Sequence, residues 1–429
     1  MKKFIPLMVM IGLFTSTLCF AQRYTVTEIG RYGSNIGDIY RINGGVDLDN
    51  GVMMVIGVMV APSALSLTGK ANQAFIWFLG DDAIYPLEQI LEDGEEFRSS
   101  EALDVNRRGV VVGTFRSVTN RSYAAIWSPP DYRARLVTPR ERHDARGIND
   151  EGFIAGRGPN EQGNFKPYLM DPDPEGDITY FGESRLNPVE MNDLNQIVGN
   201  GLLLPNGESH AFLWEPGANP VDLGTLGGMS LASAINYLGV VVGQSHQQAI
   251  IKLPDRPMED LGTPNGFSNP VANDINDRGA IVGSARLSGQ IGFESLRGMI
   301  FEYREEPQDI NNLLDLMPEQ EGLILHNLVA ISQSGKMVGY GSKQGVRYVY
   351  LLTPDEEDLY IRGDCNQDGT MDISDGILIL DINYSRTDLF PHFNACDANG
   401  DLEVDVSDGI YIFNYLFLGG PEPPPPFPQ

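Results

Sequence analysis

Two acidic segments near the end of the chain hold the residues best suited to chemistry. The first begins at Asp364 and the second begins 33 residues later, at Asp397. A hard cation such as Ca²⁺ takes about six to eight oxygen ligands, and a loop can supply them from positions 1, 3, 5, 7, 9 and 12. The spacing therefore predicts two calcium ions. Their candidate ligands, with Thr370 and Glu403 acting through the backbone carbonyl, are Asp364, Asn366, Asp368, Thr370, Asp372 and Asp375, and Asp397, Asn399, Asp401, Glu403, Asp405 and Asp408.

The two segments differ at position 6, where a calcium loop turns sharply. Gly369 occupies this position in the first segment, whereas Leu402 occupies it in the second, with Gly400 two residues earlier. We therefore expect the first loop to fit the pattern better and leave open how tightly the second binds. Two acidic surface turns without metal are the alternative interpretation.

Apolar segments over 376–384 and 409–418 follow the loops and predict two short helices. Isolated helices shorter than about 12 residues are marginal in water, so metal binding should supply folding energy. Cys365 and Cys396 are the only cysteines after residue 19, and in an oxidising compartment they predict one disulfide that ties the loops together. Two unpaired thiols are the alternative.

Aspartate at position 12, together with an apolar helix after each loop, resembles the type I dockerin family over residues 363–420, ahead of a proline-rich tail at 421–429. The resemblance implies that positions 10 and 11, Ile373-Ser374 and Val406-Ser407, and the helices after them contact a cohesin-type protein partner. A purely structural calcium module, or attachment to a cell-surface protein, is the other interpretation.

A repeated unit occupies most of the chain before these loops. Each unit reads as an apolar strand, a tight turn with Asn, Asp or Gly, and a second strand, which is a hairpin pattern. An apolar third strand follows, as in residues 211–214, and a fourth signature appears at 221–226 and 258–263. The second strands contain, near their ends, Gly57, Gly113, Gly156, Gly199, Gly243, Gly283 and Gly339.

Seven units of four strands predict a mainly β fold, a seven-bladed propeller over residues 22–354 followed by a small α-helical calcium-loop domain. The segment 24–30 resembles a lone fourth strand, and the last repeat stops after its third, so the first strand should complete the last blade. An open β-solenoid is the competing architecture. The motifs DLGTLGG, AIN-x-x-G-x-VVG and HAFLW are similar to the bacterial extracellular HAF repeats, which implies an exported propeller-like domain without a defined activity.

Composition restricts the location and the partners. Residues 1–21 combine a basic start, an apolar run and a small residue at the end, which predicts a cleaved export signal and a secreted protein. A formal charge of −28 excludes nucleic acid as an expected partner, since phosphates are met by Lys and Arg. No later apolar run is long enough to span a membrane. The acidic segment 355–362 is expected to be a linker.

Catalytic motifs are missing from the sequence. The five histidines are scattered, and the aspartates of the hairpins, Asp150, Asp193, Asp274 and Asp277, are interpreted as residues that bond the backbone of their own turns. Three functions stay open: an interaction propeller that binds a ligand, such as a glycan, without catalysis; a carbohydrate-active hydrolase or lyase; and a structural surface or matrix protein. A carboxyl pair with a raised pKa in the central channel would favour the enzyme.

Overall fold

The computed structural model describes residues 23–63, 68–89, 97–137, 141–171, 177–201, 208–254, 256–354, 361–366, 369–385, 393–399 and 404–423. The predicted export signal and most of the predicted linker and proline-rich tail lie outside these residues. So do Asp368, Asp401 and Glu403 of the predicted calcium loops.

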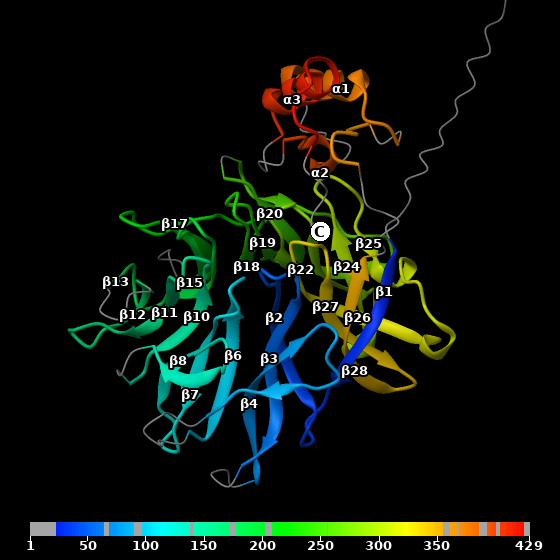
Figure 1. Ribbon diagram of the computed structural model, residues 1–429. Coiled ribbons are helices and arrows are strands. Elements are labelled where there is room, and N and C mark those ends of the chain that lie inside the picture. Colours follow the sequence, from blue (N-terminus) through cyan, green and yellow to red (C-terminus); the bar gives the residue numbers. More distant parts are fainter. Residues whose placement is uncertain are drawn as a thin grey trace, which may run out of the picture.

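Seven antiparallel sheets of four strands each form a ring (Figure 1). From the channel outward, the blades are β2 (Ile39–Asp47), β3 (Met53–Pro62), β4 (Lys70–Phe78), β5 (Tyr85–Pro86); β6 (Ser99–Val105), β7 (Val111–Arg116), β8 (Ser122–Ser128), β9 (Arg133–Leu136); β10 (Asp144–Ile148), β11 (Ile154–Pro159), β12 (Phe165–Met170), β13 (Ile178–Tyr180); β14 (Asn187–Met191), β15 (Ile197–Gly201), β16 (His210–Trp214), β17 (Val221–Asp222); β18 (Ser230–Ile235), β19 (Val241–Ser245), β20 (Gln248–Lys252), β21 (Glu259–Asp260); β22 (Phe267–Ile275), β23 (Ile281–Leu287), β24 (Leu296–Phe301), β25 (Gln308–Asp309); and β26 (Leu323–Ile331), β27 (Met337–Lys343), β28 (Val346–Pro354), β1 (Tyr24–Arg31). The predicted seven-bladed propeller is confirmed.

The recurrent glycine of the second strand has a steric cause. In the fifth blade, β18 carries a bulge between Ala232 and Ala234, directly opposite Gly243 of β19. A Cβ atom on Gly243 would overlap the carbonyl oxygen of Leu231, so only glycine allows this approach. The same bulge lies opposite the corresponding glycine in each of the other six blades.

The ring closes between the two ends of the propeller segment. Strand β1 pairs antiparallel with β28, from Tyr24 opposite Pro354 to Arg31 opposite Tyr348. Tyr24 and Val26 of β1 are buried in a cluster with Leu352 and other residues of the last blade. The prediction that the first strand completes the last blade is confirmed, and the open solenoid is excluded.

The apolar core lies between neighbouring blades. All three tryptophans lie in the third strands and are buried there; Trp214, for example, stacks on Phe181 at 4.0 Å between ring centroids. Three short 3-10 helices, η1 (Phe293–Ser295), η2 (Ile310–Asn312) and η3 (Pro318–Gln320), lie in loops of the last two blades.

The described part of the C-terminal region contains the helices α1 (Ile373–Ser385), α2 (Phe393–Cys396) and α3 (Val406–Leu418). α1 and α3 begin three residues earlier than predicted because the last loop residues form the first helical turn. Asp405 and Asp408 make a capping box at the start of α3, where each side chain accepts a backbone N–H. Within the described residues, no helix has the length and apolar character needed to cross a membrane.

Candidate functional site

The first acidic loop is ordered around the carboxylate of Asp375, which is fully buried at the start of α1. This carboxylate accepts the backbone N–H groups of Asn366, at 3.0 Å, and Asp372, at 2.8 Å. Asp364 is also buried and accepts the N–H of Gly369 at 2.9 Å. Gly369 has a φ of 89°, so it makes the left-handed turn expected at position 6.

The second loop repeats this bonding pattern. The fully buried Asp408 accepts the N–H groups of Asn399, at 3.1 Å, and Asp405, at 2.9 Å. The amide of Asn399 donates to the Ser407 hydroxyl at 2.9 Å, just as Asn366 donates to Ser374 at 2.8 Å. The predicted duplication of the loops is therefore present in the structure as well as in the sequence.

The chemistry of the donor set fits a hard cation. Asp364, Asp375, Asp397 and Asp408 are at most 5% exposed, and buried carboxylates need cationic or hydrogen-bonding partners. Of the other predicted ligands, Asp372, Asp405 and Thr370 are exposed, and Asn366 and Asn399 are partly buried. No three acidic, His or Cys side chains among the described residues lie close enough together to hold a metal ion. The positions outside these residues, Asp368, Asp401 and Glu403, include one predicted side-chain ligand of each loop.

The predicted disulfide joins the two loops. Cys365 and Cys396 are bonded, with Cα atoms 4.4 Å apart, and both are buried against Ile379 of α1 and Ile412 of α3. The backbone N–H of Gly363 donates to the carbonyl of Ala395 at 2.7 Å. The segments that precede the two loops therefore lie side by side.

Replacing both cysteines with serine should destabilise this region by about 3 to 4 kcal/mol, the loop-closure entropy expected for bridged residues 31 apart in sequence. Hydrogen exchange of α1 and α3 should accelerate while the propeller stays protected. A reducing agent should do the same to the unmodified chain and should add nothing in the double variant. Unchanged protection of both helices would show that the bridge is dispensable.

Buried asparagines of the hairpin turns connect the blades around the channel. Each Oδ1 closes its own turn, and each side-chain amide donates to the corresponding carbonyl of the next blade, as from Asn106 to Asn149 at 3.0 Å. The later steps of this ladder join Asn149 to Asn192, Asn192 to Asn236, Asn236 to Asn276 and Asn276 to Ser332.

Acidic residues of the hairpins also bond across blades. Asp150 accepts the backbone N–H of Arg107 at 2.8 Å, and Asp277 accepts that of Tyr237 at 2.7 Å. Asp193 accepts the N–H of Asp150 in the same way. The interpretation that these carboxylates bond their own turns is therefore wrong for Asp150, Asp193 and Asp277, since their partners lie one blade away. Asp274 lies on β22 before the turn and accepts the N–H groups of Ile275 in its own strand and of Ile331 in the next blade, so the interpretation is wrong for Asp274 as well.

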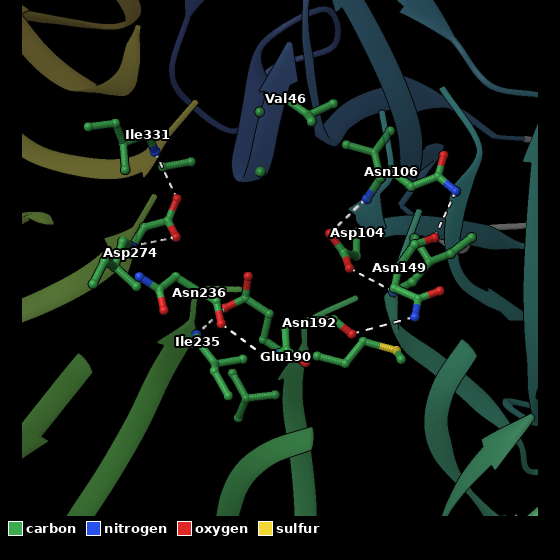
Figure 2. Close-up of a pocket in the computed structure, with 18 of the residues that line it drawn as sticks. Val46, Asp104, Asn106, Asn149, Glu190, Asn192, Ile235, Asn236, Asp274 and Ile331 are labelled. Carbon is green, nitrogen blue, oxygen red and sulfur yellow. Dashed lines mark hydrogen bonds between the residues drawn. The ribbon is translucent and has the colours of Figure 1, made fainter. Parts of the chain in front are cut away.

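Three carboxyl groups from alternate blades line a cavity of about 420 Å³ in the channel (Figure 2). Asp104 accepts the N–H groups of Val105 and Ile148, both at 2.8 Å. Glu190 accepts the N–H of Ile235 at 3.2 Å, and Asp274 accepts those of Ile275 and Ile331. The residues in register with them in the other four blades are small: Gly44, Gly147, Ala234 and Ala330.

Burial raises the pKa of each of these carboxyl groups. For Asp104 burial outweighs the two backbone hydrogen bonds and brings the pKa to about 7. The pKa of Asp274 rises to about 6 for the same reason. Burial, and then the negative charges of Asp274 and Asp104, raise the pKa of Glu190 well above its ordinary value. Asp104 and Asp274 therefore take up protons near neutral pH.

The HAFLW and DLGTLGG motifs contact each other through His210, the first residue of HAFLW, and Asp222, the first residue of DLGTLGG. The Nδ1 atom of His210 lies 2.9 Å from the carboxylate of Asp222, which can only accept, so Nδ1 carries the hydrogen. Asp222 also accepts the N–H of Gly224, whose φ is 84°. In the next blade Gln248 replaces the histidine and donates to Asp260, so this contact belongs to the repeat.

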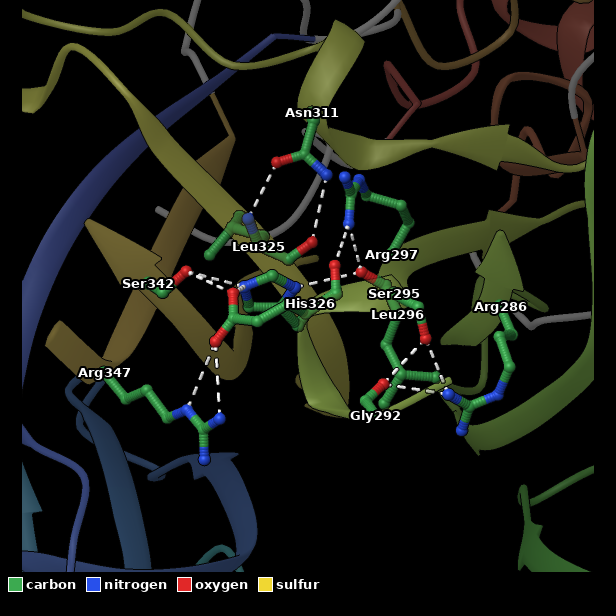
Figure 3. A network of polar contacts seen from close by, with 11 residues as sticks. Arg286, Gly292, Ser295, Leu296, Arg297, Asn311, Leu325, His326, Ser342 and Arg347 are labelled. Carbon is green, nitrogen blue, oxygen red and sulfur yellow. Dashed lines mark hydrogen bonds and ion pairs between the residues drawn. The ribbon is translucent and has the colours of Figure 1, made fainter. Parts of the chain in front are cut away.

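A second buried histidine belongs to a network that joins the last two blades (Figure 3). His326 Nδ1 lies 3.0 Å from the carbonyl of Leu296, and Nε2 lies 2.7 Å from the Ser342 hydroxyl and 3.2 Å from Glu294. Burial lowers the pKa of His326. Because His326 is fully buried and Ser342 is 6% exposed, this pair holds the loop before β24 against the last blade and does not reach solvent.

Comparisons with known proteins support no more than the fold. No protein-family model matches the chain, and no curated protein matches it. Among solved structures, the β-propeller domain of the Trilobed protease from Pyrococcus furiosus is 11% identical with a TM-score of 0.48, over 75% of this chain and 100% of that one. Virginiamycin B lyase from Staphylococcus aureus is 11% identical with a TM-score of 0.45, over 77% and 99%.

TolB from Acinetobacter baumannii is 10% identical with a TM-score of 0.38. The match covers 70% of this chain and 63% of the TolB chain. Likeness at this level says nothing about activity. The class of this protein is therefore set by its own architecture, a seven-bladed propeller with a disulfide-linked helical C-terminal region.

Proposed function

We propose that this chain is an exported calcium-binding protein whose propeller binds a ligand without catalysis and whose C-terminal module attaches it to a protein partner. The observation that carries the proposal is the duplicated geometry of the two acidic loops, in which Asp375 and Asp408 accept equivalent N–H groups. The disulfide supports export, because such bonds persist in oxidising compartments.

The exposed side of the helices supports a protein partner. Three pairs of apolar residues recur 33 positions apart on α1 and α3, and every member is at least 49% exposed: Ile373 and Val406, Ile377 and Ile410, and Tyr384 and Phe417. Single exposed apolar residues are ordinary, but a duplicated set on two packed helices indicates a binding surface. A cohesin-type or cell-surface protein is the proposed partner, and the similarity of the two helices would permit two binding orientations.

Calcium titration of the chain without residues 1–21 tests the metal site. We expect two binding events, and at calcium 100 times above the dissociation constant each site should add about 2.7 kcal/mol to the stability of the module. Asp375→Ala should remove one event. Asp381→Ala, which removes a carboxylate of α1 outside the loop, is the matched control and should keep both. Absence of binding heat in the unmodified chain would refute the proposal.

A carbohydrate-active hydrolase or lyase is the second candidate. It is favoured by the carboxyl groups of Asp104, Glu190 and Asp274 in the channel, whose raised pKa values suit proton transfer. Against it, each group accepts a backbone N–H from the next blade, which is a structural role. Release of sugars or unsaturated products from soluble polysaccharides would favour the enzyme, and no turnover would favour the binding protein.

A further inference from the structure

A buried arginine contacts the first residue of the second loop. Arg362 precedes the first loop, yet its Nη1 donates to the Asp397 carboxylate at 2.9 Å and to the Asp397 carbonyl at 2.6 Å. The two side chains are only 5% and 2% exposed. Residues 361–423 contain twelve Asp and Glu but only two Arg and no Lys, so a buried cation at this position is conspicuous.

The first residue of the first loop, Asp364, has a different hydrogen-bond donor from that of Asp397. Asp364 accepts a backbone N–H from Gly369, whose positive φ directs that group into the loop. The residue that corresponds to Arg362 ahead of the second loop is Ala395, which has no side-chain donor. Position 6 of the second loop is Leu402, and a leucine rarely adopts the left-handed conformation of Gly369. The N–H of Gly369 thus bonds the first residue of the first loop, and the guanidinium of Arg362 bonds the first residue of the second loop.

We propose that Arg362 is the resident cation of the second loop. It neutralises Asp397 and holds its carboxylate in place before calcium arrives, so the two loops bind calcium with unequal affinity. Removing the cationic partner of a buried carboxylate strongly lowers the stability of the folded state, because an uncompensated charge stays buried. This cost explains why Arg362 is buried together with Asp397. Calcium at the second loop gains less, since Asp397 is already neutralised and the guanidinium repels the ion. This inference rests on the proposed calcium binding of both loops.

Calorimetric titration of calcium into three forms of the chain without residues 1–21 tests the role of Arg362. In the unmodified chain we expect one tight and one weak site. Arg362→Met keeps the length of the side chain and removes its charge, and it should tighten the weak site by about tenfold or more, the size of one charge interaction near a protein surface. Arg362→Lys keeps the charge and should leave the weak site within about threefold of its original affinity.

Hydrogen exchange without calcium gives a second readout. In Arg362→Met, protection of α3 should be lost and should return when calcium is added. Tryptophan fluorescence reports separately on the rest of the chain, because Trp77, Trp127 and Trp214 all lie in the propeller.

The outcomes separate the two proposals. If the unmodified chain binds no calcium, the proposed function fails. If it binds two ions and Arg362→Met leaves the weak site unchanged or weaker, the role of Arg362 is wrong while calcium binding stands. A loss of protection in Arg362→Met that calcium does not reverse would also contradict a role as a resident cation.

Discussion

Val26→Asp should open the propeller ring and lower its unfolding free energy by about 4 kcal/mol. Val26 lies on β1 opposite Leu352 of β28, in the apolar cluster of the last blade. The substitution loses the burial of valine and places a carboxylate in an apolar site, which costs several kcal/mol. Thermal unfolding followed by tryptophan fluorescence should show a midpoint lower by roughly 5 °C or more.

Thr27→Asp is the matched control, because it introduces the same charge one residue later on the solvent side of the same strand. Its effect should stay within about 0.5 kcal/mol. Equal effects of the two variants would mean that the contact between β1 and β28 does not hold the ring together.

The unfolding free energy of the propeller should also fall as the pH rises from about 4 to 7. Asp104 and Asp274 have pKa values of about 7 and 6 in the folded chain, against an ordinary value of 3.8. A raised pKa in the folded state stabilises it fully below the ordinary pKa, and this stabilisation is lost as the pH rises through the folded value. Between its ordinary pKa and its pKa in the folded chain, each such group lowers the unfolding free energy by about 1.4 kcal/mol for every unit of rising pH. The melting temperature should therefore be higher at pH 5 than at pH 7.5.

Asp104→Asn should flatten this dependence. The amide replaces one acceptor oxygen with a donor and lowers stability at every pH, so the slope is the quantity to compare. Asp131→Asn, which removes an exposed carboxylate on the surface of the second blade, should keep the slope. A wild-type melting temperature that rises from pH 5 to 7.5 would show that ionising these carboxyl groups does not destabilise the fold.

The propeller could be predicted because its defining features are local. The glycine opposite each bulge, the turn before it and the apolar third strand lie close together in sequence, so each blade is visible in one continuous stretch. The disulfide followed from there being two cysteines after the export signal. Even the closing strand was visible, since residues 24–30 resemble the fourth strand of a repeat.

Contacts between blades could not be predicted in this way. The asparagine of the turn recurs in the sequence, but its amide bonds a carbonyl 40 to 56 residues away, for example from Asn236 to Asn276 and from Asn276 to Ser332. The channel carboxyl groups Asp104, Glu190 and Asp274 occupy equivalent positions opposite the second strands, but the sequence singled out only Asp274, and that as a turn residue. Their raised pKa values depend on burial, which only the closed ring creates. The contact of Arg362 with Asp397 likewise depends on the chain path set by the disulfide.

The pairing of β1 with β28 also constrains the order of folding. Tyr24 and Pro354 are separated by almost the whole propeller sequence, so β1 is synthesised long before its partner strand β28. Contacts of such long sequence separation form slowly. Until the seventh blade exists, β1 is an unpaired edge strand that can join the wrong sheet or a second chain. Conditions that delay synthesis of the last blade should therefore promote misfolding and association mainly through strand β1.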